Sequence, residues 1–68
     1  MARIEIYHGA WTWSGEYEIP DRGEVPVEGV TAMMKGVVER DGLFRVRVDG
    51  RMVVLGAGAL STSVVILE

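Results

Sequence analysis

Residues 43–55, LFRVRVDGRMVVL, decide the fold, because they form two alternating runs on either side of Asp49-Gly50. An Asp-Gly pair between such runs is a strong signal for a β-hairpin with a two-residue turn. The turn fixes the register, because a shift by one residue would move every apolar side chain to the opposite face. One face then carries the apolar set Phe44, Val46, Val48, Val53 and Leu55. The other face carries Leu43, Arg45, Arg47, Met52 and Val54.

A second hairpin is predicted over residues 2–19, around a turn that begins at Gly9. Glycine in the first turn position favours a type II′ turn, and the resulting register gives one almost wholly apolar face. Gly15 lies on that face and has no side chain. We expect the neighbouring rings of Trp13 and Tyr17 to fill the space above it.

Residues 28–42 carry apolar side chains at the i, i+3, i+4, i+7 and i+8 spacing of one helix face. These side chains are Val30, Met33, Met34, Val37 and Val38. Gly42 suits the left-handed residue that follows a helix end. Against a helix, Gly36 and the valines are weak helix formers, and Asp41-Gly42 also suits a hairpin turn. We therefore predict a helix here, with a strand as the alternative.

The C-terminal part of the sequence is glycine-rich and then continuously apolar. Residues 56–59, Gly-Ala-Gly-Ala, are interpreted as a flexible connection, and residues 62–68 as a closing strand. The run Val64–Leu67 has no polar residue, which is typical of a strand covered on both faces in the middle of a sheet.

The predicted order of elements is β-β-α-β-β-β in a single domain, residues 1–68. We expect a small α+β fold in which one helix packs on a mixed sheet and the last strand lies beside the first. The order is similar to that of β-grasp domains, although the C-terminal Gly-Gly of their carrier members is missing. The alternative is an all-β small barrel of the OB or SH3-like type, because residues 36–50 resemble the opening strands of an S1-like or OB barrel. Neither similarity assigns a family.

Composition excludes several means of stabilising and anchoring the chain. A chain of 68 residues buries only about 60% of its unfolded surface. It has no cysteine and one histidine, so disulfides and thiolate metal sites are excluded, and we expect no cofactor. Self-association or docking on a protein partner remains as a stabilising route. We expect a cytoplasmic location and no membrane contact, because we find neither a signal segment nor a membrane-spanning run.

Few residues of the sequence suggest catalysis or ligand binding. His8 is the only imidazole, and it belongs to no recognised catalytic motif, so we expect no enzyme activity. Arg45 and Arg47 lie on one side of their strand, and Arg40 would join them if Asp41 began a hairpin turn. They form either a solvated sheet face or a basic stripe that binds phosphate or acidic protein.

Trp11 and Trp13 hold much of the aromatic surface. We expect Trp13 in the core and Trp11, near a turn, to be partly exposed and to serve as an interface anchor.

The net charge of −3 argues against a general nucleic-acid binder. We therefore expect a non-enzymatic protein-interaction module that acts through a sheet face or edge. A small adaptor, an assembly subunit and a compact acidic inhibitor of the phage type all fit this description. The alternative is a sequence-tolerant nucleic-acid-binding small barrel that uses Arg40, Arg45 and Arg47.

Overall fold

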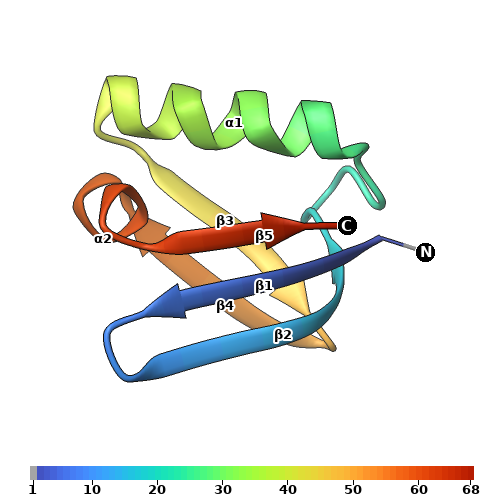
Figure 1. The fold of residues 1–68 in the computed structure, drawn as a ribbon. Helices are drawn as coiled ribbons and strands as arrows, with labels where there is room; N and C mark the ends of the chain where they lie inside the picture. Colours follow the sequence, from blue (N-terminus) through green and yellow to red (C-terminus); the bar gives the residue numbers. More distant parts are fainter. Residues whose placement is uncertain (1) are drawn as a thin grey trace.

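Both predicted hairpins are present in the computed structural model, which describes residues 2–68 (Figure 1). Strands β1 (Arg3–His8) and β2 (Trp11–Glu18) form the first hairpin, and β3 (Leu43–Val48) and β4 (Arg51–Gly56) form the second. The register of each hairpin is the predicted one. Gly9 has a φ of 60°, as a type II′ turn requires, and Asp49 and Gly50 have φ values of 48° and 81°, as a type I′ turn requires.

Residues 27–40 form a helix, α1 (Val27–Arg40), which confirms the helical interpretation and makes the all-β alternative wrong. The helix ends one residue earlier than expected. Asp41, not Gly42, takes the left-handed conformation, with a φ of 54°, and the Gly42 N–H donates to the Val37 carbonyl at 2.9 Å. Aspartate tolerates this conformation because its short polar side chain can hydrogen-bond locally.

The glycine-rich connection is a short helix, α2 (Ala57–Ser61), so the prediction of a flexible segment is wrong. Ala57 and Leu60 lie three residues apart and are both buried, and this burial holds the helix in place. Strand β5 (Val64–Leu67) follows directly.

The strands of residues 2–68 form one open sheet in the order β4-β3-β2-β1-β5, and the predicted α+β class is confirmed. The last strand lies beside the first, as expected. The sheet is antiparallel throughout rather than mixed. The reason is that α2 delivers the chain to the end of β1, so β5 begins opposite Tyr7 and runs back toward Ile4. β5 is an edge strand, and Val64 and Ile66 on its outer face are exposed, so the prediction of a central strand covered on both faces is wrong.

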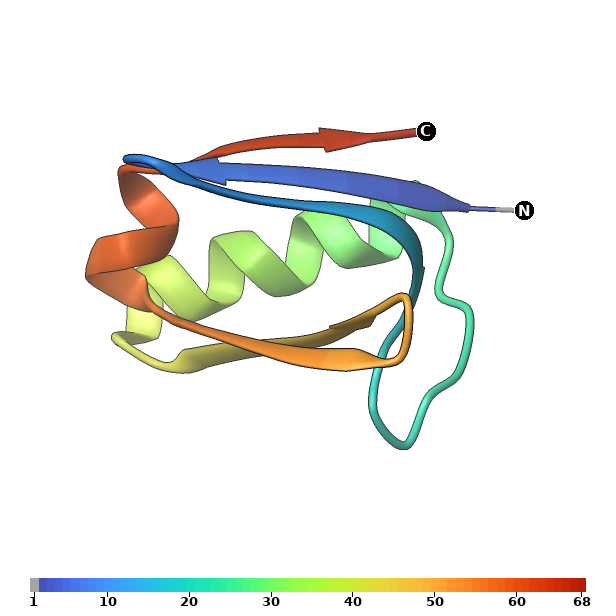
Figure 2. The same cartoon turned by 90° about the horizontal axis from the view of Figure 1, so that it is seen from below.

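The sheet bends along β2, because β2 pairs with β1 through residues 11–16 and with β3 only through Tyr17 and Glu18. The two hairpins therefore face each other as two layers, and Figure 2 shows α1 between them on the open side. The apolar side chains of both layers meet there. The buried core consists of Ile4, Ile6, Tyr17, Ile19, Val30, Phe44, Val46, Val48, Val53, Leu55, Ala57 and Leu60.

Candidate functional site

The three arginines selected from the sequence do not form one basic surface. Arg45 and Arg47 share the outward face of β3, as predicted, but Arg40 is the last residue of α1 and folds back over Gly36. Arg47 makes an ion pair with Glu18, with 2.5 Å between Nη1 and Oε1. The structure therefore brings together two of the three arginines, and the positive charge of one is balanced.

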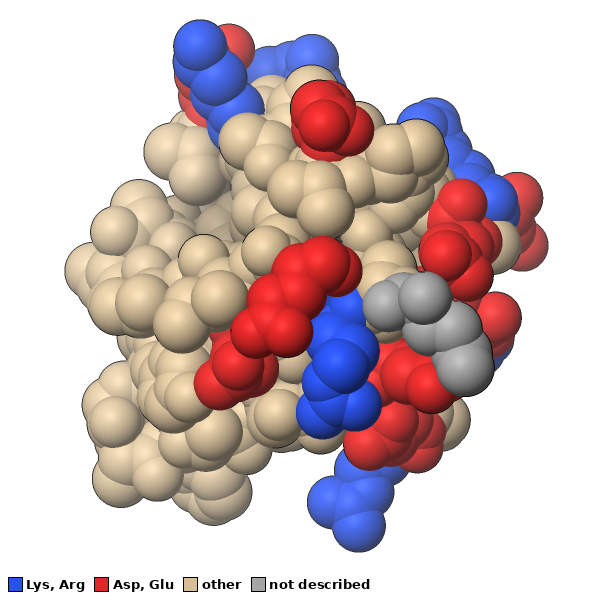
Figure 3. All heavy atoms as spheres, turned by 45° about the vertical axis from the view of Figure 1, so that its right-hand side comes forward, with Lys and Arg blue, Asp and Glu red and all other residues tan. Residues whose placement is uncertain are grey.

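Acidic side chains surround Arg47. Glu16, Glu18, Glu24 and Asp49 line a hollow with it beside the β3–β4 turn. Figure 3 shows Asp and Glu side chains gathered around the end of the molecule where the termini lie, next to a broad uncharged area. The surface around this arginine is thus acidic rather than basic.

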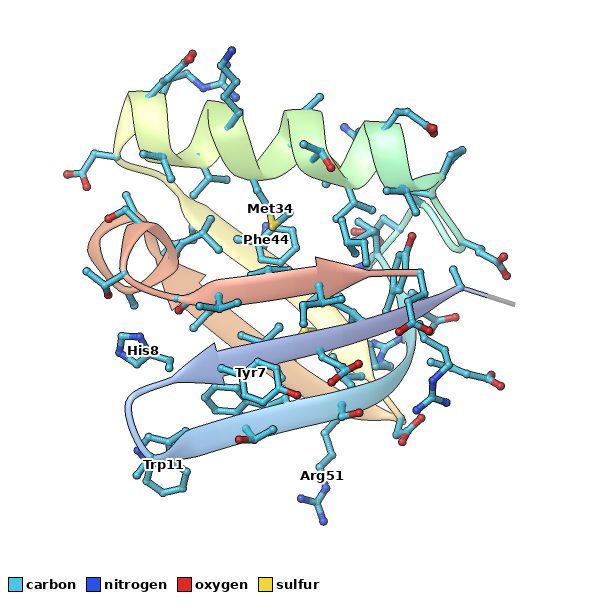
Figure 4. The ribbon with its side chains drawn as sticks, in the orientation of Figure 1. Tyr7, His8, Trp11, Met34, Phe44 and Arg51 are labelled. Carbon is cyan, nitrogen blue, oxygen red and sulfur yellow. The ribbon has the colours of Figure 1, made fainter. Side chains whose placement is uncertain are left out.

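Trp11 is exposed at the tip of the β1–β2 hairpin, with an exposed fraction of 68% (Figure 4). Trp13 is half-buried and packs against the core. The two indoles stack, with ring centroids 6.4 Å apart and planes inclined by 13°. Trp11 thus has the exposure that an interface anchor needs, on a hairpin tip that Trp13 supports.

His8 contacts a serine whose hydroxyl also bonds to the backbone. The Ser63 hydroxyl donates to the Ala59 carbonyl at 2.6 Å, and its oxygen lies 3.1 Å from His8 Nδ1. The direction of the hydrogen bond between Ser63 and His8 depends on the imidazole tautomer. The pair joins the end of β1 to the start of β5.

β5 forms a free edge of the sheet with backbone groups that point away from the protein. Arg3 and Glu68 exchange two backbone N–H···O bonds, of 3.2 and 3.0 Å. In an antiparallel pair, doubly bonded positions alternate with positions whose N–H and C=O groups point to the other side. The backbone groups of Val65 and Leu67 therefore point outward from β5.

The outer face beside this edge is apolar. Val64 and Ile66 have exposed fractions of 60% and 42%, and Tyr7, which pairs with Val64 across the two strands, has 38%. The Tyr7 hydroxyl donates to a Glu5 carboxylate oxygen, and this hydrogen bond raises the pKa of Tyr7. Between residues 5 and 7 of β1, Glu5 is the one charged side chain on the outer face beside β5.

The inner side of the same edge is a groove of about 460 Å³ between α1, α2 and β5. Its apolar lining consists of Met34, Val38, Leu60 and Val65. Lys35, Glu39, Ser61 and Ser63 complete it. Figure 4 shows Met34 pointing from α1 toward the sheet and Phe44. Val38 is 41% exposed although it belongs to the predicted apolar stripe of the helix, because the fold leaves this part of α1 uncovered.

Sequence reasoning missed this groove and did not identify β5 as an edge strand. The available signal was the apolar run Val64–Leu67, which we interpreted as a strand covered on both faces. The same run on an edge strand leaves alternate apolar side chains, Val64 and Ile66, without a covering layer.

A scan against protein-family models, a search of curated proteins and a search of solved structures each found no match for this chain. Among residues 2–68, no helix is both long and apolar enough to span a membrane. Within the same residues, no group of three or more His, Cys, Asp or Glu side chains is arranged to hold a metal ion. The assignment of function therefore depends on the geometry of the surface.

Proposed function

We propose that this protein is a non-enzymatic protein-interaction module that binds an extended segment of a partner protein along the edge of β5. One observation carries the proposal: the outward backbone groups of Val65 and Leu67 lie beside an apolar groove on one side and exposed apolar side chains on the other. An added strand would satisfy the backbone groups and cover both apolar surfaces at once, as in other strand-addition complexes.

The absence of charge along β5 supports this use of the edge. Proteins commonly protect a free strand edge with lysine, proline, a bulge or an inward-pointing charge. Residues 63–67, Ser-Val-Val-Ile-Leu, contain none of these residue types. Covering Val64 and Ile66 would contribute about 1 kcal/mol each to binding, which favours a partner on this edge.

The other edge strand, β4, is less suited to strand capture. Met52 and Val54 are exposed there, with exposed fractions of 46% and 50%, but Arg51 lies on the same strand. Arg45 and Arg47 stand opposite Val54 and Met52 on the adjacent strand. Arg51 is a charge on the edge strand itself and protects β4 in the way that charges usually protect an edge.

The nucleic-acid alternative has weaker support. It needs a cationic surface, whereas Arg47 is paired with Glu18 and Arg40 lies on a different element from Arg45. An adaptor, an assembly subunit and an inhibitor would all use a strand-capturing edge, so the proposal does not depend on which of these roles the partner gives it.

The test is a peptide selection from a random displayed library on the purified protein, followed by affinity measurement on variants. Val65→Pro removes an outward N–H and places a proline ring on the edge, without removing a bond to β1. Val54→Pro is the matched control, because alternation from the Asp49-Gly50 turn points the Val54 N–H outward from β4.

We expect both variants to fold, and the selected peptide to bind Val54→Pro normally but Val65→Pro at least tenfold more weakly. In the native protein, the peptide should slow amide hydrogen exchange at Val65 and Leu67. Equal binding to both variants, or unchanged exchange at these two amides, would contradict the proposal. The exchange measurement needs no variant, so it decides the question even if a proline unfolds β5.

A further inference from the structure

If the β5 edge captures a strand, the groove also defines the direction and charge order of the segment that enters it. Resting on the proposed function, we infer that the partner segment runs antiparallel to β5 and carries an acidic residue on the N-terminal side of a central apolar residue and a basic residue on the C-terminal side. The inference uses the inner wall of the groove, which is formed by α1.

The groove needs an apolar side chain at its centre. Along an added strand, successive side chains point to opposite faces of the extended sheet, so alternate ones enter the groove. The side chain opposite Val65 would meet Met34, Val38 and Leu60, which are the apolar lining. The intervening side chains would lie beside Val64 and Ile66 on the outer face.

The direction follows from the sheet. Each strand pair of residues 2–68 is antiparallel, and Val65 and Leu67 present their outward N–H and C=O groups two residues apart. An antiparallel strand meets this spacing with doubly bonded pairs and is slightly more stable per residue than a parallel one.

The charge order follows from the helix. Figures 1 and 2 both show α1 running opposite to β5, so Lys35 stands nearer the end of β5 than Glu39 does. Glu39 lines the groove together with Ser61 and Ser63, which precede β5. A strand antiparallel to β5 therefore passes Lys35 first and Glu39 second.

Both charges are available to a partner. The side-chain ion pair of residues 2–68 joins Arg47 to Glu18 and involves neither Lys35 nor Glu39. They are exposed side chains one helical turn apart, about 6 Å along the axis. In a partner strand, the inward side chains that flank the central one are four residues apart, about 13.6 Å. The acid and the base would therefore reach Lys35 and Glu39 through the length of the side chains on both sides.

The experiment uses two synthetic peptides of alternating valine and threonine. The first carries glutamate near its N-terminus and lysine near its C-terminus, and the second carries the same two residues exchanged. Their affinities are measured by calorimetry for the native protein and for the double variant Lys35→Glu with Glu39→Lys, at low and at high salt.

We expect the native protein to bind the first peptide about three- to tenfold more tightly than the second, as exposed charge pairs allow. The double variant should reverse that preference, and high salt should weaken it in both proteins. Arg3→Glu with Glu16→Arg is the control, because it exchanges a cross-strand pair outside the groove lining and preserves the net charge.

The outcomes separate this inference from the proposed function. Equal affinity for both peptides, with binding still lost in Val65→Pro, overturns the charge order and leaves strand capture intact. A native preference for the second peptide that the double variant reverses overturns the antiparallel direction. Failure of both peptides to bind the native protein overturns this inference, and strand capture is overturned as well if the library-selected peptide leaves exchange at the Val65 and Leu67 amides unchanged.

Discussion

Asp49 and Glu16 join the two hairpins through a pair of hydrogen bonds. The Asp49 N–H donates to the Glu16 carbonyl at 2.9 Å, and the Glu16 N–H donates to Asp49 Oδ1 at 3.0 Å. One aspartate thereby binds both backbone groups of a residue in β2. The contact lies where β2 passes from one layer to the other, so it holds the bend of the sheet.

Gly15→Ala should destabilise the protein by about 2 kcal/mol or more. A Cβ on Gly15 would overlap the Asp49 carboxylate, and Gly15 has a φ of 154°, which side chains rarely adopt. Urea unfolding measures the change. Gly58→Ala is the control, because a Cβ there meets nothing within 4 Å and alanine favours a helix. It should raise the stability slightly, and a loss in Gly15→Ala no larger than in Gly58→Ala would contradict the contact.

Asp49→Ala should cost about 1–2 kcal/mol alone, because it removes a hydrogen bond and leaves alanine at a positive φ. In a Gly15→Ala background it should cost less, since it removes the carboxylate that the new Cβ overlaps. A double-mutant cycle measures this coupling, which we expect to reach about 1 kcal/mol. Strictly additive effects would mean that the two residues do not share the space.

Tyr17→Phe should reduce the stability at neutral pH and flatten its dependence on pH in alkali. The Tyr17 hydroxyl donates to the Val25 carbonyl at 2.6 Å and so ties the 20–26 loop to β2. Loss of this bond should cost about 1 kcal/mol. Burial of the phenol, followed by the negative charges of Glu24 and Glu28, raises the pKa of Tyr17 above its ordinary value of 10.0.

The sign of the pH effect follows from that shift. The folded state favours the neutral phenol, so its contribution is complete below pH 10.0 and is lost as the pH rises through the folded-state pKa. Urea unfolding at neutral and alkaline pH should therefore show a smaller alkaline loss in Tyr17→Phe than in the native protein. Tyr7→Phe, on the outer face, is the control and should leave the neutral-pH stability near that of the native protein. An unchanged alkaline slope in Tyr17→Phe would contradict the shift.

Val46→Asp should unfold the protein, because Val46 is fully buried and an aspartate there has no partner for its charge. Val54→Asp, on the opposite face of the same hairpin, should be tolerated, because Val54 is half exposed and lies opposite Arg45. Circular dichroism and thermal melting separate the two results. Similar stability of both variants would contradict the register of the hairpin.

The hairpin registers could be predicted because they depend on residues close together in the sequence. Gly9 and Asp49-Gly50 select their turn types, and each turn fixes the pairing of the strands around it. The space over Gly15 could not be predicted in the same way. The residue that occupies it, Asp49, is distant in the sequence, and the bend of β2 brings it there instead of the rings of Trp13 and Tyr17.

At the candidate site, too, only the features that depend on residues close together in the sequence could be predicted. The exposure of Trp11 follows from its position near the turn, and the shared face of Arg45 and Arg47 follows from strand alternation; the structure has both. The groove is lined by side chains from α1, α2 and β5. The helix α2 was not predicted, because the glycines of residues 56–59 indicated a flexible connection. Whether Val64–Leu67 lies at the centre or the edge of a sheet depends on strand order, which no local pattern carries.

The reciprocal bonds between Arg3 and Glu68 have a mechanical consequence. They place the start of β1 beside the end of β5, at the outermost pair of an antiparallel ladder. A pulling force applied between these two residues loads the ladder one rung at a time, from Arg3 and Glu68 inward. The strand pair would open like a zipper at low force instead of resisting in shear, so traction on this end of the molecule would peel β5 away before it disturbed the β3–β4 hairpin.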